Sequence, residues 1–154
     1  MLSEKEKQEI STELAHAPTK MSASIEALHI VQRHQGWVSD ESLRDVATIL
    51  NTTVHELDAV ATFYSLIFRQ PVGKHMILIC DSVSCWVMDY NPLLDVIKAK
   101  LNIGFGGTTP DKQFTLLPVA CLGACDRAPA MMIDDDLYGP VTPKMMEEIL
   151  EKYK

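Results

Sequence analysis

Four cysteines are the residues of this sequence whose type and spacing can do chemistry. They form two pairs: four residues separate Cys80 from Cys85, and three separate Cys121 from Cys125. Two sulfide-bridged irons need four thiolate ligands, two on each iron, so the set matches a [2Fe–2S] cluster. From the spacing we favour an iron–sulfur cluster, and zinc, redox-active thiols and unliganded core cysteines stay open as alternatives.

Each alternative has a usual sequence pattern that differs from the one found. Zinc ribbons and knuckles mostly use tighter C-x2-C pairs on hairpin turns, whereas the spacings here are C-x4-C and C-x3-C. Thiol–disulfide oxidoreductases carry C-x-x-C at the start of a helix, where the helix dipole lowers the pKa of one thiol. This sequence has no C-x-x-C, so a non-catalytic, zinc-bearing adaptor is the stronger rival to the cluster.

The elements between the two cysteine pairs are expected to bring the pairs together. Apolar runs predict strands over His75–Cys80 and Phe114–Ala120, and the pattern of Asn91–Leu101 predicts a helix between them. A strand–helix–strand unit of this length joins two parallel strands, whose following loops leave the sheet at the same edge. Open α/β sheets usually bind ligands at that edge. Because proline cannot donate a backbone hydrogen bond, Pro118 indicates that the end of this strand lies at an edge of the sheet or is irregular.

The remaining elements form two groups. Before residue 70 we predict four short helices, which suggest a small bundle. The first contains Ile10 and Leu14 and ends at Pro18, and the N-caps of the next three are expected at Ser22 or Ser24, Ser39 and Thr53. After the cysteines we predict a strand over 130–134, a turn at Asp135 and Asp136, and a final helix capped by Thr142.

The segment with Pro71 and Gly73 separates the two groups, because both residues stop a helix. The fold class expected from residues alone is therefore mixed, with a helical bundle over 1–70 and an α/β domain over 71–154. Nothing in the helical half has the pattern of a catalytic site.

Charge and hydropathy exclude several classes of protein. The 154 residues have a formal net charge of −7, the opposite sign from that of a general nucleic-acid or anionic-membrane binder. The charged start lacks the apolar core of a secretory signal, and no apolar run approaches the roughly 20 residues of a membrane-spanning helix. We therefore expect a cytoplasmic chain without direct membrane insertion, in a compartment where structural disulfides are rare.

The sequence carries no expected catalytic residues and no nucleotide-binding motif. We find no nucleophile paired with a base, and the glycines of Gly104–Gly107 follow a predicted helix instead of opening one, which makes a poor phosphate site. FMN and NADH are therefore not expected on this chain. Trp86, directly after Cys85, is expected to shield the site from water, and the apolar stripe Phe63–Phe68 is expected either to pack in the bundle or to dock a partner.

The motifs CDSVSC and CLGACDRAP, with ATFYSLIFRQPVGKH and ALHIVQRHQGWVSDESL before them, resemble the E-subunit family of bacterial respiratory NADH:quinone oxidoreductase, complex I. The resemblance covers about residue 22 to the C-terminus. It implies a helical bundle followed by a thioredoxin-like [2Fe–2S] ferredoxin domain. It also implies one [2Fe–2S] cluster with Cys80, Cys85, Cys121 and Cys125 as its ligands.

The same resemblance implies partners and a place in the cell. The chain would be a non-substrate-binding subunit of the oxidoreductase (a translocase), docked on the FMN- and NADH-binding subunit beside other peripheral-arm subunits. It would exchange single electrons with the flavin and lie peripherally at the inner face of the plasma membrane. Equivalent subunits of NAD-linked hydrogenases and formate dehydrogenases are the near alternative.

Overall fold

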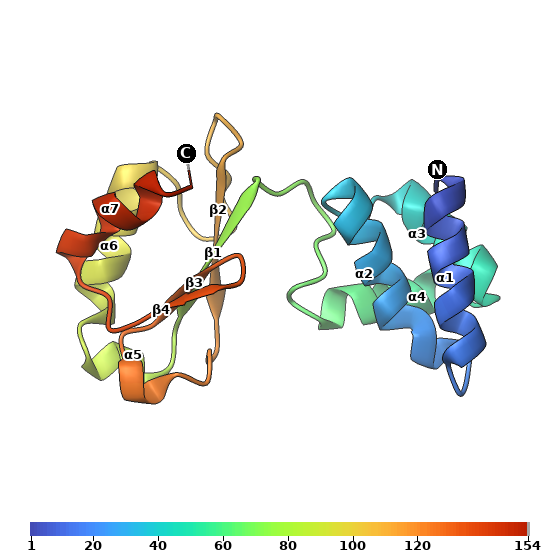
Figure 1. Ribbon diagram of the computed structural model, residues 1–154, viewed down its shortest axis with the longest axis horizontal. Helices are drawn as coiled ribbons and strands as arrows, with labels where there is room; N and C mark the ends of the chain where they lie inside the picture. The colour runs from blue at the N-terminus through green and yellow to red at the C-terminus, as the bar shows by residue number, and fades with distance from the viewer. Residues whose placement is uncertain (154) are drawn as a thin grey trace. The chain divides into compact units, whose positions relative to one another are not determined.

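The computed structural model describes residues 1–153 and divides into two compact units (Figure 1). The first unit comprises Met1–Pro71, and the second begins at Val72. Each unit has its own cluster of buried apolar side chains. No helix in the described part of the chain is long and apolar enough to cross a membrane.

The first unit is a bundle of four α-helices. Their bounds are α1 Glu4–His16, α2 Ser24–Gln35, α3 Asp40–Leu50 and α4 Val54–Phe63, and a 3₁₀ turn, Met21–Ala23, precedes α2. The predicted number and order of helices are confirmed. The bundle core buries side chains from all four helices, including Ile10, Leu28, Leu43 and Leu57.

Side chains cap two of these helices as predicted. The hydroxyl of Ser39 accepts a hydrogen bond from the backbone N–H of Ser42, and Thr53 forms a reciprocal capping box with Glu56. Gly36 ends α2 with a φ of 82°, a left-handed conformation that glycine adopts without a steric penalty.

The predicted cap of α2 was wrong. Ala23 occupies the N-cap, because the 3₁₀ turn leads the chain directly into the helix. Ser24 is already helical and donates its hydroxyl to the carbonyl oxygen of Met21. Ser22 exchanges hydrogen bonds with Thr19 in the preceding turn. Both serine side chains therefore form hydrogen bonds with neighbouring turn residues, and neither accepts a bond from an unpaired N–H at the start of α2.

The second unit contains a mixed four-stranded sheet in the order β2-β1-β3-β4. The strands are β1 His75–Cys80, β2 Phe114–Val119, β3 Met131–Ile133 and β4 Asp136–Tyr138. As predicted, β1 and β2 are parallel, with Cys80 opposite Val119, whereas β3 runs antiparallel to β1 and to β4. Because β2 is an edge strand, the ladder tolerates Pro118, which is exposed.

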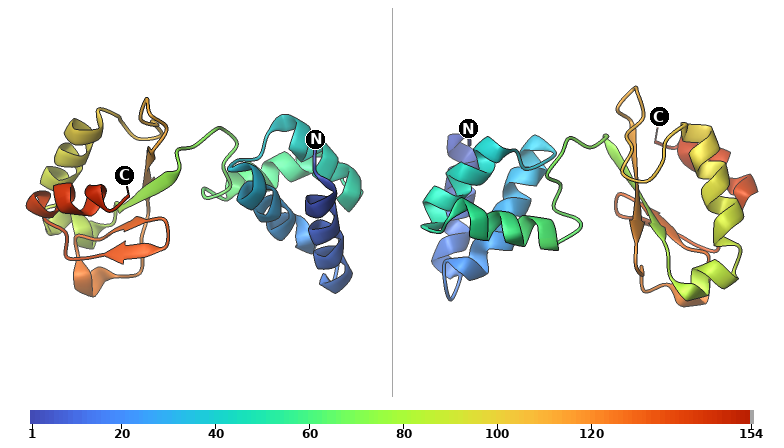
Figure 2. Two further views of the ribbon diagram at one scale, coloured as in Figure 1. Left: turned by 45° about the horizontal axis from the view of Figure 1, so that its top comes forward. Right: turned by 180° about the vertical axis from the view of Figure 1, so that it is seen from behind.

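Helices α6, Tyr90–Leu101, and α7, Met146–Glu151, cover one face of this sheet (Figure 2). A 3₁₀ turn, Pro143–Met145, leads into α7. The core between these layers is apolar and closely packed, with fully buried side chains from strands and helices: Ile77, Ile79, Leu93, Ile97, Leu116, Met131 and Met146. The expected mixed fold class is confirmed.

Four local features differ from the prediction. The turn after β3 is formed by Asp134 and Asp135, and Asp136 begins β4, which was missed. Asp134 adopts a left-handed φ of 51°, which aspartate tolerates better than most residues. Thr142 precedes the last helical turns, but its side chain makes no capping hydrogen bond. The five-residue helix α5, Val83–Val87, was also missed, and it carries Cys85.

Candidate iron–sulfur site

The first cysteine pair lies where β1 ends and α5 begins. Cys80 is the last residue of β1, and Cys85 is the third residue of α5. Both side chains are buried, with exposed fractions of 2% and 1%. The backbone of Cys80 is fixed by the sheet and that of Cys85 by the helix, so regular secondary structure restrains both residues of this pair.

The second pair lies in the loop after β2, at the same end of the sheet (Figure 1). Cys121 follows the strand by two residues, and Cys125 starts a 3₁₀ turn, Cys125–Arg127. Gly123 between them has a φ of 75°, a conformation that a residue with a Cβ rarely adopts. Both thiols are exposed, unlike those of the first pair.

Backbone amides from neighbouring loops point at the sulfur atoms. The N–H of Gly123 donates to Cys121 Sγ over 3.3 Å. The backbone N–H groups of Leu122 and Ala130 act on the sulfurs of Cys80 and Cys85 respectively, and each lowers the pKa of its thiol. The amide of Leu122 therefore links the second loop to the first cysteine pair.

These contacts give the two buried thiols different acidities. Burial by itself raises the pKa of Cys80, but the backbone N–H groups of Leu122 and Ser82 and the Cys85 thiol outweigh it and lower the pKa below the ordinary thiol value. Burial also raises the pKa of Cys85, and the neighbouring Cys80 raises it further. Of the two groups, Cys80 therefore ionises first and accepts the hydrogen bond of the Cys85 thiol.

The number and type of the donor side chains bear on the kind of metal centre. Across residues 1–153, no three His, Cys, Asp or Glu side chains lie close enough together to hold one metal ion. A structural zinc needs four ligands around a single ion, whereas a [2Fe–2S] cluster takes two thiolates on each of two irons. Four free cysteines in two pairs are the donor set that such a cluster takes.

The difference in burial predicts a difference in chemical labelling. When the apoprotein is treated with iodoacetamide, we expect Cys121 and Cys125 to be alkylated at least about tenfold faster than Cys80 and Cys85, because the buried pair reacts only after local opening. Peptide mass spectrometry over time measures the four rates separately. In urea the four rates should converge, and fast labelling of Cys80 in the folded protein would contradict the structure.

Arg127 and Gly139 hold the second cysteine loop, and no local sequence signal points to either. Arg127 Nε donates to the carbonyl oxygen of Gly139 over 3.1 Å. A Cβ on Gly139 would clash with the carbonyl oxygen of Arg127 and come within 3.0 Å of its Cβ. The N–H of Val141 bonds the carbonyl of Pro129 over 2.9 Å. Segment 139–141 therefore packs closely against the loop that carries Cys125.

The helix beside the cysteines exposes apolar side chains. Val83, Trp86, Val87 and Met88 are all more than half exposed, and we call them the α5 surface. Trp86 was expected to shield the site, but 59% of it is exposed, so it shields little within this chain.

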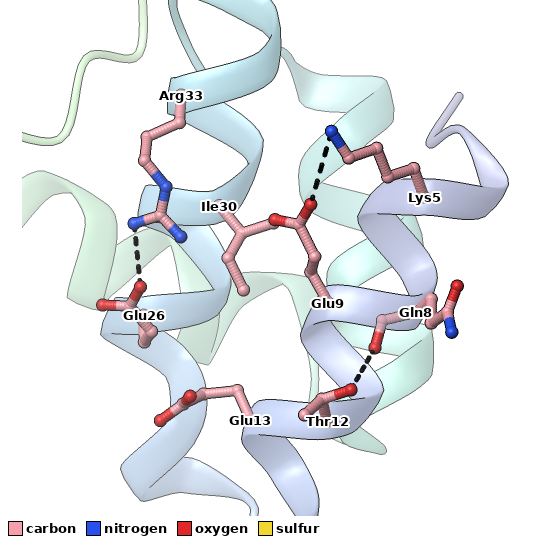
Figure 3. Close-up of a pocket in the computed structure, with 8 residues that line it drawn as sticks. All are labelled: Lys5, Gln8, Glu9, Thr12, Glu13, Glu26, Ile30 and Arg33. Atoms are coloured by element: carbon pink, nitrogen blue, oxygen red, sulfur yellow. Dashed lines mark hydrogen bonds and ion pairs between the residues drawn. The ribbon is translucent and has the colours of Figure 1, made fainter.

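A groove between α1 and α2 is one of the concave surfaces of the helical unit (Figure 3). Its volume is about 460 Å³. It is lined by Lys5, Gln8, Glu9, Thr12, Glu13, Glu26, Ile30 and Arg33. Its cations are already paired, Arg33 with Glu26 at 2.8 Å and Lys5 with Glu9 at 4.0 Å. The two cations of the groove are therefore already neutralised within this unit.

Comparison with known proteins agrees with this geometry. The family described as thioredoxin-like [2Fe-2S] ferredoxin matches residues 10–154. The E subunit of the NADH-quinone oxidoreductase of Pseudomonas aeruginosa is 48% identical over 153 residues, covering 99% of this chain and 92% of the relative. The corresponding E subunit of Escherichia coli K12 gives the same identity and coverage.

A solved structure extends the likeness to the fold. The crystal structure of an NAD+-reducing [NiFe]-hydrogenase in its H2-reduced state matches with a TM-score of 0.73 at 24% identity. The match covers 84% of this chain but only 22% of the hydrogenase chain, so it is evidence for the fold alone. By its sequence relatives and its matched family, the chain belongs to the thioredoxin-like [2Fe–2S] ferredoxin family, and among its members to the E subunits of NADH-quinone oxidoreductases.

Proposed function

We propose that this chain is the [2Fe–2S] electron-transfer subunit of an NADH:quinone oxidoreductase, with Cys80, Cys85, Cys121 and Cys125 as the cluster ligands. The observation that carries the proposal is that the parallel strands β1 and β2 lead both cysteine loops to the same end of the sheet. When bound, the cluster takes up and releases one electron at a time. The chain itself contributes the ligands, their amide donors and the buried surroundings of the first pair.

The two expected domains would have different roles. Residues 71–154 carry all four cysteines and would form the cluster domain, whereas residues 1–70 carry none and would serve assembly. In the helical unit, 79% of Phe63 and 43% of Tyr64 are exposed, whereas Ile67 is buried. The expected apolar stripe is therefore part core and part surface, and its exposed part is suited to docking.

The α5 surface supports a docking site for the electron partner. It lies beside Cys85, so a protein seated on it would come close to the cluster. Asp81, Asp89 and Asp126 are exposed in the adjoining segments, which favours a partner with basic residues around an apolar centre. We assign this partner role to the subunit that binds FMN and NADH, within the peripheral arm at the inner face of the plasma membrane.

The relatives separate this function from the nearest alternative. The E subunits of NADH-quinone oxidoreductases are 48% identical over almost the whole chain, whereas the hydrogenase likeness rests on the fold. We therefore place the chain in a quinone-reducing complex and not in an NAD-linked hydrogenase or formate dehydrogenase.

Metal analysis of anaerobically purified protein tests the proposal directly. We expect about two irons and two acid-labile sulfides per chain, and a single spin-half EPR signal after dithionite reduction. Stoichiometric zinc without sulfide, persisting after reconstitution with iron and sulfide, would replace the cluster with a structural adaptor. A co-purification experiment tests the docking surface. We expect the tagged chain to co-purify with a flavoprotein, and we expect Trp86→Asp to abolish this association. The control Met21→Asp, at an exposed methionine of the helical unit, should retain it.

A further inference from the structure

Ser82 has a polar atom that the fold leaves without a partner. It lies between the first two cysteines and occupies the N-cap of α5. Its hydroxyl oxygen is inaccessible to solvent and has no hydrogen-bond partner in the described part of the chain. A buried hydroxyl without a partner is destabilising, so such a group in a native fold needs an explanation.

Helix capping does not explain it. A serine at the N-cap usually accepts a hydrogen bond from an N–H of the first helical turn, but the Ser82 side chain makes no such bond. Its backbone is nevertheless held in place, because its carbonyl oxygen accepts the N–H of Trp86 over 2.9 Å. The side chain is therefore free of the helix while its position is fixed.

Ser82 lies in the short turn that joins the two cysteines of the first pair, the last residue of β1 and the third residue of α5. The Ser82 hydroxyl oxygen and both cysteines are buried at this junction. A hydroxyl both donates and accepts, and a thiolate bound to iron is a pure acceptor. The buried oxygen thus lies between two residues whose sulfurs become acceptors once they are ligands.

We propose that Ser82 is a positioning and tuning residue, whose hydroxyl donates a hydrogen bond to the sulfur side of the iron–sulfur centre and raises its reduction potential. The inference rests on the proposed function, since it needs the cluster on these cysteines. One-electron reduction adds negative charge to the sulfurs, and a donor stabilises that charge more than it stabilises the oxidised state. No proton leaves Ser82 in this role.

The test compares four variants by redox titration followed by EPR. Ser82→Ala and Ser82→Gly both remove the hydroxyl, and glycine remains a tolerated N-cap. Ser82→Thr keeps the hydroxyl and should restore the wild-type potential. Ser84→Ala is the matched control, because Ser84 lies in the same motif and its hydroxyl is not among the buried, unpaired atoms.

We expect Ser82→Ala and Ser82→Gly to lower the ratio of reduced to oxidised cluster about tenfold at a fixed potential, a shift of about 59 mV to more negative values for one electron. Ser84→Ala should not shift it. Potentials for Ser82→Ala and Ser82→Gly equal to that of Ser84→Ala, in chains that all hold two irons and two sulfides, would overturn the inference alone. Absence of the cluster from the wild-type chain would instead overturn the proposed function.

Discussion

Replacing Cys80 with alanine is expected to give a folded chain that retains less than about a tenth of the wild-type iron and sulfide. Cys80 connects the two cysteine loops, because its N–H bonds the carbonyl of Ala130 over 3.1 Å and the backbone of Leu122 lowers the pKa of its thiol. Without that sulfur, one iron lacks a ligand and the second loop loses its contact with the first pair.

The same replacement at the other cysteines separates binding from stability. We expect Cys85→Ala, Cys121→Ala and Cys125→Ala to lose the cluster to a similar extent. In the apoproteins, changes at the buried Cys80 and Cys85 should cost about 1 kcal/mol of unfolding free energy, and changes at the exposed Cys121 and Cys125 almost nothing. Iron and sulfide assays and urea unfolding measure the two effects. A variant that keeps two irons and two sulfides would remove its cysteine from the ligand set.

Replacing Gly139 with alanine is expected to be the most damaging change outside the cysteines. The added Cβ would clash with the backbone oxygen of Arg127, which is rigidly linked to Cys125 by one 3₁₀ turn. Relief of the clash requires a backbone shift, because no flexible side-chain end lies in the way. We expect a loss of about 1–3 kcal/mol of unfolding free energy from the overpacking.

The shift should also reach the cluster. Residues that orient metal ligands typically change metal affinity 10- to 100-fold, so we expect iron to pass to a chelator at least about tenfold faster than from the wild type. Gly104→Ala is the matched control, because no atom lies within 4 Å of its added Cβ. Arg127→Met tests the same contact without a clash, by removing the Nε donor to Gly139. Wild-type stability and iron retention in Gly139→Ala would show that segment 139–141 does not hold the loop.

The sequence was sufficient to predict those features that depend on a single capping residue or on a run of apolar residues. Ser39 and Thr53 begin helices through their side chains, Gly36 ends one through its backbone freedom, and all three act as predicted. The strands β1 and β2 have strong apolar runs, and the helix between them required a parallel crossover. The meeting of both cysteine loops at one edge follows from these elements alone.

The short elements were not predicted, because they are stabilised by contacts with neighbouring parts of the fold. The helix α5 has five residues, too few to show a helical repeat, and β4 has three residues that exist as a strand only through pairing with β3. At the start of α2, the turn from Thr19 decided which residue became the cap, although Ser22 and Ser24 were equally good candidates.

The sequence by itself determined the ligand chemistry, because four cysteines in two pairs can bind only a few kinds of centre and the motifs around them are specific. The tertiary structure alone decided that one pair is buried and the other exposed, and that Trp86 faces outward. It also decided the roles of Ser82, Arg127 and Gly139, since each acts through atoms brought near by folding. Spacing along a chain specifies which atoms are available, but burial and hydrogen bonding depend on what the rest of the fold places around them.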